Sequence, residues 1–523
     1  MKKTHRMSEK PMRGKVVDGD EEKSQKQMLV DLAMEEVELF HTPDEKAYAS
    51  VKLEGGQSEN WRVGGKRFQQ FLIGRYYNDG GVPPDSRALK DAIATLEAVA
   101  LFDGEEHPVH LRVAKHDGKL YLDLANEKRE AIEIQEDGWN KVANPPDAVK
   151  FVRSANSAPL PDPARNGTID ELRTFLNLRK ADGPGGADDD FYLSVGWLIN
   201  CFNPDGPFII LNLEGEQGSS KTTMARLLRS LVDPAVEPMR SPPREQRDLA
   251  IAAAGNWIIT LDNLSGLKRG LSDALCRLAT GGGNAYRTLY TDEEETLFSA
   301  KRPMLLNGID SIATRGDLQE RSIILNLPAI PPHARRAERE FWAAVEEAKP
   351  RILGALLDAV SCALRNHDSV QLDESPRMID ATRWVTAAEG ALGWPEGSFA
   401  KAFLDNQEHM VEIALETNLV AVALKAFMQD YEEGEEWSGS PTELLDDLRL
   451  LVSEKDQRSY SWPKAPNALG FWLRRLAPQL RSIGIEFEGE GREPDAGRAR
   501  FWKVRKTTAG YDRPGRPGRP ALD

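Results

Sequence analysis

The residues that most constrain what this chain can fold into are 215–223, Gly-Glu-Gln-Gly-Ser-Ser-Lys-Thr-Thr. An apolar run suited to a buried strand precedes them at 208–213, and Leu227, Leu228 and Leu231 follow at helical spacing. A loop between a strand and a helix directs its amides and the helix N-terminus at anionic phosphates. The sequence therefore predicts a binding site for a nucleoside triphosphate, ATP, together with Mg²⁺.

Within this loop, Lys221 would reach the β- and γ-phosphate oxygens, and the Thr222 hydroxyl would ligate Mg²⁺. The usual motif has glycine immediately before the lysine, whereas this chain has Ser220 there and Gly218 two residues earlier. We expect a perturbed loop geometry rather than a lost site; the simpler alternative is a plain glycine turn. The expected nucleotide-binding residues are Gly215, Gly218, Ser219, Ser220, Lys221, Thr222 and Thr223.

Three further polar positions follow apolar runs downstream. The run at 257–261 ends in Asp262, which we expect beside the metal, and Asn263 stands where many such ATPases carry an acid that polarises water. An amide can orient water but cannot take its proton, so slow or partner-dependent hydrolysis is one expectation. Asn307 ends the run at 303–306 and could contact the γ-phosphate or the attacking water. A plain buried strand that ends in a polar turn is the alternative for Asp262.

The segment 315–321 contains Arg321, whose guanidinium could stabilise charge on a transferring phosphoryl group, commonly from a neighbouring subunit. Taken alone, Arg321 is as simply explained as a surface arginine. The expected catalytic residues are Lys221, Asp262, Asn263, Asn307 and Arg321.

In this order and compact spacing, the four elements resemble the superfamily 3 helicase core of the AAA+ class, as in primase-helicase-type proteins of phages, prophages and poxviruses. The resemblance covers about 170–330 well. It implies an α/β, AAA+ P-loop ATPase core in which Asn307 is a sensor and Arg321 an arginine finger. It also implies a homo-oligomeric ring, hexameric, around a nucleic-acid strand.

Between the second and third elements, residues 278–290 resemble an extra motif of that family that forms a DNA-contacting hairpin. Tyr286, Arg287 and Tyr290 could contact a strand by charge and stacking. The expected tip at 292–295 is acidic and would repel phosphates, so a hairpin with a solvated acidic turn is the alternative.

The C-terminal segment 437–506 predicts a winged-helix-like domain. Ser440-Pro-Thr-Glu443 predicts a helix start with a capping box, a second helix is expected over 467–482, and β segments follow at 485–487 and 500–504. Residues 461–523 contain 13 Lys and Arg against 7 Asp and Glu. The expected DNA-binding residues here are Arg474, Arg475, Arg481 and Arg498; the alternative is a protein-docking domain.

Elsewhere the pattern predicts a succession of domains. They are a flexible arm over 1–45 with one amphipathic helix near 28–40, a small α+β domain of short strands over 46–157, the ATPase core over 166–333 with helices at 169–178 and 191–202, a helical region over 334–430, and a disordered tail over 507–523. Asp117, Asp123 and Asp137 show no diagnostic arrangement of metal-binding acids, so we expect no catalysis in the second of these domains.

The net charge of −15 argues against a protein that coats nucleic acid over its whole surface, so any contact should be local. The three cysteines are widely spaced, and no apolar run could span a bilayer, so we expect a cytoplasmic protein without a membrane partner. The leading hypothesis is a helicase or translocase of a mobile element that acts on single- or double-stranded DNA with other replication proteins. Two alternatives stay open: an ATP-binding switch or scaffold with weak hydrolysis, and a winged-helix DNA-binding regulator.

Overall fold

The computed structural model describes residues 23–53, 56–179, 188–282, 284–287, 295–298, 300–309, 312–313, 315–374, 376–459, 461–492 and 500–507. The chain divides into two units, which are described separately. The first contains residues up to 133 together with 140–155, and the second contains 134–139 and the remainder from 156. No helix of the described residues is long and apolar enough to cross a membrane.

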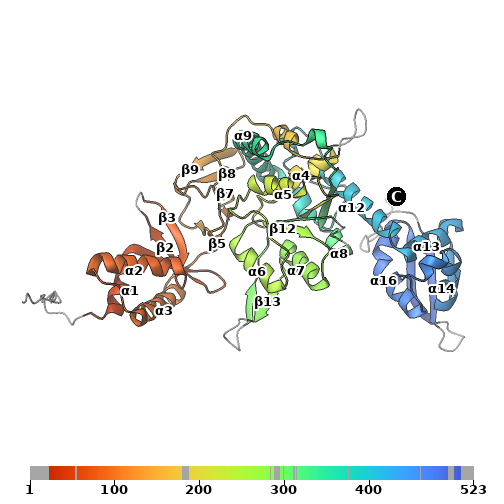
Figure 1. The fold of residues 1–523 in the computed structure, drawn as a ribbon, viewed down its shortest axis with the longest axis horizontal. Coiled ribbons are helices and arrows are strands. Elements are labelled where there is room, and N and C mark those ends of the chain that lie inside the picture. Colours follow the sequence, from red (N-terminus) through yellow and green to blue (C-terminus); the bar gives the residue numbers. More distant parts are fainter. Residues whose placement is uncertain are drawn as a thin grey trace, which may run out of the picture. The chain divides into compact units, whose positions relative to one another are not determined.

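The first unit begins with a helix that packs on a mixed sheet (Figure 1). The sheet has the order β3-β2-β1-β4, and the helices are α1, α2 and α3. Their bounds are α1 Gln25–Glu36, β1 Val37–His41, β2 Ala47–Lys52, β3 Ser58–Arg62, α2 Lys66–Gly80, α3 Ser86–Phe102 and β4 Glu105–Glu106. Leu29 and Ala33 of α1 are fully buried in the core formed with Phe68, Leu72 and Leu96.

This packing corrects the expected arm over 1–45. The expected helix near 28–40 ends at Glu36, and residues 37–41 form strand β1 instead. The sequence pattern at the junction is ambiguous because apolar residues continue through it, whereas antiparallel pairing with β2 fixes the strand. Residues 1–22 of the expected arm lie outside the described residues.

Short strands complete the first part of the chain, as the sequence predicts. They are β5 Val109–His110, β6 Val113–His116, β7 Lys119–Asp123, β8 Ala131–Gln135, β9 Gly138–Val142 and β10 Lys150–Phe151. A tight turn joins β6 and β7, where Asp117 and Gly118 both have positive φ, at 49° and 75°. Two consecutive residues of that kind match the twist of a tight hairpin.

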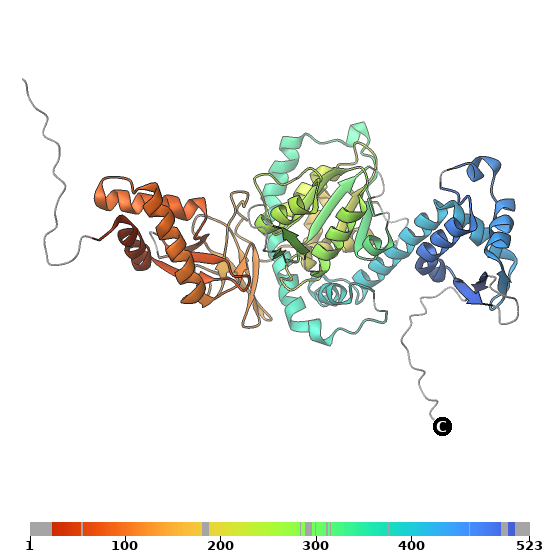
Figure 2. The same ribbon diagram turned by 90° about the horizontal axis from the view of Figure 1, so that it is seen from below.

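The second unit is built on a four-stranded parallel sheet in the order β12-β15-β11-β16, with helices around it (Figure 2). The strands are β11 Ile210–Glu214, β12 Ile259–Leu264, β15 Met304–Gly308 and β16 Ser322–Asn326. The flanking helices are α4 Asp189–Asn200, α5 Lys221–Ser230, α6 Gln246–Gly255, α7 Arg269–Thr280 and α8 Gly316–Gln319. The helix expected over 169–178 is instead a 3₁₀ segment, Ile169–Phe175, whose end backbone is extended at Leu176.

Beyond the sheet the chain is helical, as expected for 334–430. The helices are α9 Glu338–Asn366, α10 Ile379–Thr386, α11 Glu389–Leu392, α12 Ser398–Glu416 and α13 Leu419–Phe427. Helix α12 lies beside the edge strand β16. The side-chain amide of Asn406 on this helix makes the hydrogen bonds that a neighbouring strand would make. Its Oδ1 accepts from Ile324 N at 2.9 Å, and its Nδ2 donates to Ile324 O at 2.8 Å.

The C-terminal part adds a three-stranded antiparallel sheet, β17-β19-β18, to three helices. The elements are β17 Glu436–Gly439, α14 Pro441–Leu450, α15 Glu454–Gln457, α16 Pro466–Ser482, β18 Ile485–Arg492 and β19 Arg500–Lys506. The capping box at Ser440 and Glu443 is confirmed. The sequence does not predict strand β17, since this segment follows an acidic stretch and pairs only through β19. The expected tail over 507–523 lies outside the described residues beyond Thr507.

Candidate functional site

The predicted phosphate-binding loop lies at the carboxyl end of β11 and the N-terminus of α5. Parallel pairing places Leu213 of β11 beside Asn307 of β15, so the polar residues that follow the strands meet at one edge of the sheet. This edge brings together Lys221, Thr222, Asp262, Asn263 and Asn307, as the sequence predicts.

Glycine is required where the loop leaves β11. Gly215 has φ 144°, and a Cβ there would lie 2.6 Å from Leu327 O. Gly218 also has positive φ, at 88°. The departure at Ser220 has a visible consequence, because this serine is the N-cap of α5 and adopts the left-handed conformation with φ 62° and ψ 26°. A side chain in that region carries strain that glycine would not.

The Lys221 ammonium points back into the loop. Its Nζ donates to Gly215 O at 2.7 Å and to Glu216 O at 2.8 Å, and it lies 3.4 Å from Ser219 Oγ. Partial burial lowers the pKa of Lys221, and the Asp262 carboxylate opposes that effect. A cation held among loop carbonyls can turn toward a phosphate without leaving the loop.

The two residues predicted to hold Mg²⁺ are in direct contact. Thr222 Oγ1 donates to Asp262 Oδ1 at 3.1 Å, although they lie forty positions apart in the chain. A hydroxyl beside a carboxylate at a helix N-terminus is an oxygen pair of the type that Mg²⁺ accepts.

Asn263 and Asn307 are also joined. Asn263 N donates to Asn307 Oδ1 at 2.8 Å, and Asn263 has a positive φ of 56°. Asn307 is 1% exposed, and its Nδ2 has no hydrogen-bond partner among the described residues. A buried donor of this kind indicates a missing acceptor, such as water or a phosphate oxygen.

Sequence reasoning missed the segment that braces the loop from behind. Leu327 N donates to Glu214 O at 2.8 Å, and Ile330 N donates to Gly218 O at 3.2 Å. Asn177 Nδ2 bridges Ser219 O at 3.0 Å and Pro328 O at 2.7 Å. No sequence signal marks these contacts, because most of them are made by backbone groups.

The same segment ends in a cation beside the loop. The Arg335 Nη2 lies 3.6 Å from the position that a Cβ on Gly218 would occupy, and its side chain is exposed. The only sequence signal was a pair of arginines, Arg335 and Arg336, shortly after the last strand of the sheet.

Arg321 lies at the opposite end of the strands from the loop, immediately before β16. Its carbonyl accepts from Ile210 N, at the start of β11, whereas the loop follows the end of that strand. Five residues of strand separate the two ends by about 16 Å. Arg321 Nη1 donates to Asp317 O, and its buried Nε has no partner among the described residues.

The predicted DNA contacts are described only in part. The hairpin is confirmed in backbone as β13 Asn284–Arg287 and β14 Glu295–Phe298, paired antiparallel. The side chains of Tyr286 and Arg287 and all of Tyr290, Asp292 and Arg498 lie outside the described residues. On α16, Arg474, Arg475 and Arg481 are exposed, opposite the buried Leu469, Leu473, Leu476 and Leu480.

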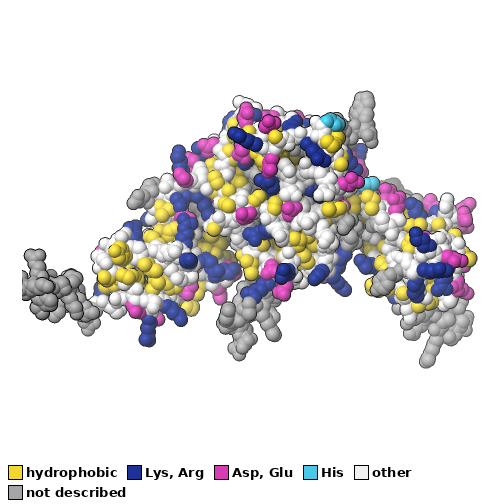
Figure 3. Space-filling model, in the orientation of Figure 1, with side chains coloured by type: hydrophobic (Ala, Val, Ile, Leu, Met, Phe, Trp, Pro, Cys, Tyr) yellow, Lys and Arg dark blue, Asp and Glu magenta, His cyan; other side chains and the backbone are white. Residues whose placement is uncertain are grey.

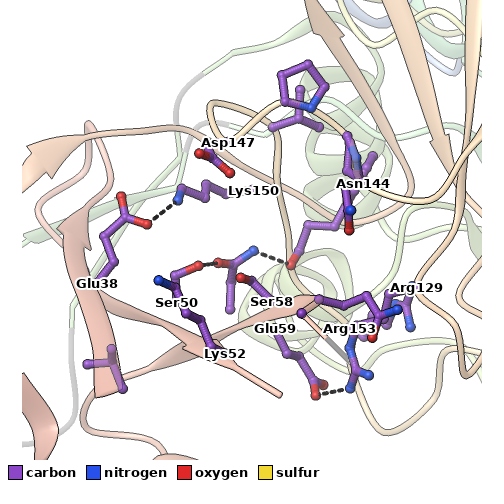
Figure 4. A pocket seen from close by; sticks show the side chains of 18 of the residues that line it. Glu38, Ser50, Lys52, Ser58, Glu59, Arg129, Asn144, Asp147, Lys150 and Arg153 are labelled. Carbon is purple, nitrogen blue, oxygen red and sulfur yellow. Dashed lines mark hydrogen bonds and ion pairs between the residues drawn. The ribbon is translucent and has the colours of Figure 1, made fainter. Parts of the chain in front are cut away.

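The first unit contains a separate hollow of about 650 Å³ lined by charged side chains (Figure 4). Lys150 Nζ donates to Glu38 at 3.0 Å, Glu59 accepts from Arg67 and Arg129, and Arg153 is paired with Asp123. These ion pairs satisfy the charges of the residues that form them. Among the described residues no cluster of His, Cys, Asp or Glu could hold a metal ion, and the expectation of no catalysis there stays a prediction.

The sheet and loop define an α/β fold of the phosphate-binding-loop class. Residues 178–408 match the family model described as actinomycete integrative conjugative element replication protein, and residues 420–517 match that of the AICE RepA C-terminal domain. The chain is thus similar, over its middle and C-terminal parts, to a replication protein of a mobile element. No curated protein matches the chain.

Three solved structures are similar over most of their length. One, entitled "SCCmec type IV Cch - active helicase", is 11% identical to this chain. The similarity covers 90% of this chain and 93% of the other, with a TM-score of 0.47. Two A form apo structures of the NrS-1 C terminal region are 11% and 12% identical to this chain. The similarity covers 93% and 92% of this chain and 100% of each of theirs, with TM-scores of 0.40 and 0.37.

Proposed function

We propose that this chain is an ATP-dependent DNA helicase or translocase that acts in the replication of a mobile element as an oligomeric ring. The observation that carries the proposal is the contact between Thr222 and Asp262 beside Lys221, at the edge of the sheet where Asn307 offers a free buried donor. The match to replication-protein models supports the biological setting.

The residues of this edge fit ATP and Mg²⁺. The described residues hold no cluster of three acids or histidines for a metal, so Mg²⁺ would depend on Thr222, Asp262 and phosphate oxygens. Bound Mg²⁺ would neutralise charge on the phosphates. Lys221 would bind the terminal phosphates, Asn307 Nδ2 would donate to the γ-phosphate or a water, and Asn263 would orient water without accepting its proton.

Arg321 cannot reach the loop of its own chain from the opposite edge of the sheet. In a ring with one repeated head-to-tail interface, that edge would face the loop of the next subunit. The exposed arginines of α16 would supply a local DNA contact from a winged-helix domain. Figure 3 shows acidic and basic side chains interspersed over the face that it draws, which fits a local contact better than a protein that is coated with nucleic acid.

The proposal is tested by steady-state ATP turnover of the full chain with and without single-stranded DNA. We expect DNA to stimulate turnover and Lys221→Ala to abolish it, whereas Lys425→Ala, an exposed lysine of α13, should leave it unchanged. Turnover that survives in the Lys221→Ala variant would show that the assigned site is wrong.

A second function is favoured by one specific observation: Asn263, rather than an acid, follows Asp262. In this alternative the chain is an ATP-binding switch or scaffold that binds DNA or partner proteins through its C-terminal domain. It predicts tight ATP binding with slow turnover that DNA does not stimulate. Replacement by Asn263→Glu should then raise the rate if the missing proton acceptor is the cause.

A further inference from the structure

The C-terminal domain has a hollow of about 470 Å³ between α16 and the β18–β19 hairpin, within the usual size range of small-ligand sites. Arg474 and Ala477 line it from the helix, and Phe487 and Phe501 line it from the strands. Phe487 is held in place by an edge-to-face contact with Trp502, with ring centroids 5.3 Å apart.

The hairpin backbone is irregular beside this hollow. Strand β18 is the edge of its sheet, and its register with β19 shifts between Gly489 and Gly491. A Cβ at Gly489 would lie 3.0 Å from the Phe487 ring, so glycine lets this ring pack against the strand backbone. Bulges of this type often re-aim a strand beside a functional site.

The walls suit a nucleotide, because they combine aromatic rings for its base with two cations, Arg474 and Lys503, for its phosphates. An aromatic ring can stack on a flat base, and a base of any sequence has a face for stacking. The hollow also contains Glu488, which lies opposite Lys503 in the strand pairing and can accept from an exocyclic amino group of cytosine or adenine.

A second observation lies on the adjoining face of α16. Phe471 is 61% exposed, and Arg474 and Arg475, three and four residues later, share its side of the helix. An aromatic ring left in water beside two arginines gives a strand a second stacking position and cations for its phosphates.

We propose that this hollow takes one unpaired base of a DNA strand, with the backbone on either side held along Arg474 and Arg475 and the neighbouring base against Phe471. The inference rests on the proposed binding of DNA by this domain and specifies its target: duplex DNA that contains an unpaired nucleotide, rather than intact duplex.

The test measures binding of the full chain, without nucleotide, to a DNA dumbbell closed at both ends, so that no strand end can enter a ring. One dumbbell is fully paired and the other has a single bulged cytosine. We expect the bulged form to bind about tenfold more tightly, from stacking of one base. Ala477→Leu, which fills the hollow, should remove this difference and keep binding of the paired form, whereas Ala477→Ser should preserve it.

Phe471→Ala provides a second variant outside the hollow, with Phe102→Ala, an 84% exposed phenylalanine of the first unit, as its control. We expect only Phe471→Ala to weaken binding of the bulged form. Replacing the bulged base with fluorescent 2-aminopurine should give quenching in the wild type but not in Ala477→Leu. Equal affinity for the two dumbbells overturns the inference alone, and failure to bind either overturns the proposed DNA-binding function as well.

Discussion

At the scale of single residues, the most informative position is Ser220, where the sequence departs from the usual loop. The structure accommodates serine by placing it in the left-handed region, which costs a side-chain-bearing residue roughly 1–2 kcal/mol. The loop therefore keeps its shape at the expense of strain.

Ser220→Gly removes that strain but adds flexibility to the unfolded chain, an opposing effect of about 0.4–1 kcal/mol. We expect a net gain of about 0.5 kcal/mol in the free energy of unfolding, measured by urea denaturation. Ser220→Ala is the control, since alanine shares the strain and should give no gain. A loss of stability in the glycine variant would contradict the assigned strain.

Arg335 lies beside the loop only because of the tertiary structure, since the two are far apart in the sequence. Because its guanidinium lies beside Gly218, we expect Arg335→Ala to weaken ATP binding about tenfold, the size of one hydrogen bond to a charged group. Titration with a fluorescent ATP analogue checks this, and AMP, which lacks the outer phosphates, should bind equally to both forms. Arg336→Ala is the matched control, and an equal effect there would point to general charge attraction.

At the scale of elements, two buried asparagines on the central sheet have opposite expected effects. Asn406 satisfies both backbone groups of Ile324 on edge strand β16, whereas neither polar atom of the Asn212 side chain in β11 has a partner among the described residues. Asn406→Leu should lower the free energy of unfolding by about 2–4 kcal/mol, because it leaves the buried N–H and C=O groups of Ile324 without hydrogen-bond partners. Asn212→Leu should raise it by about 1 kcal/mol. Chemical denaturation of both variants checks the signs, and a destabilising Asn212→Leu would indicate an unseen partner for this side chain.

Glu389 connects two helices by accepting from Gly397 N at 2.6 Å and Phe399 N at 2.7 Å at the start of α12. Burial raises its pKa to about 7, against the effect of these two donors. The folded chain therefore keeps a proton that the unfolded chain loses from about pH 4.5. Stability should fall as pH rises from about 4.5 to 7, by on the order of 3 kcal/mol, and level off above pH 7. Urea midpoints measured across this range give the slope of stability against pH, which Glu389→Gln should flatten. An unchanged slope in this variant would show that other groups cause the pH dependence.

Local sequence signals predicted the elements that carry their own chemistry. The strand, loop and helix at 208–231 and the capping box at Ser440 were found because spacing and residue type suffice for them. The boundary at Glu36, the 3₁₀ segment at 169–175 and strand β17 were missed, since pairing with distant strands or packing decides them. For the same reason, the contact of Thr222 with Asp262 could be expected but the approach of Arg335 could not.

At the scale of the whole molecule, the two halves of the proposed catalytic site lie on opposite edges of one sheet. The edge that bears Lys221 and Asp262 and the edge that bears Arg321 cannot meet within a chain, so activity should require a head-to-tail assembly. The proposed ring is therefore testable through the activity of mixed assemblies, without imaging.

Lys221→Ala and Arg321→Ala should each abolish DNA-stimulated ATP turnover when assayed alone, while Arg377→Ala, at an exposed ion pair with Glu320, should not. In an equimolar mixture, a site is complete where an Arg321→Ala chain binds ATP with its intact Lys221 and the neighbouring Lys221→Ala chain contributes its intact Arg321. Random assembly at a repeated head-to-tail interface makes about a quarter of the sites complete, so we expect about a quarter of the wild-type rate. A mixture as inactive as its components, or an active Arg321→Ala variant, would show that Arg321 does not act on the nucleotide of a neighbour.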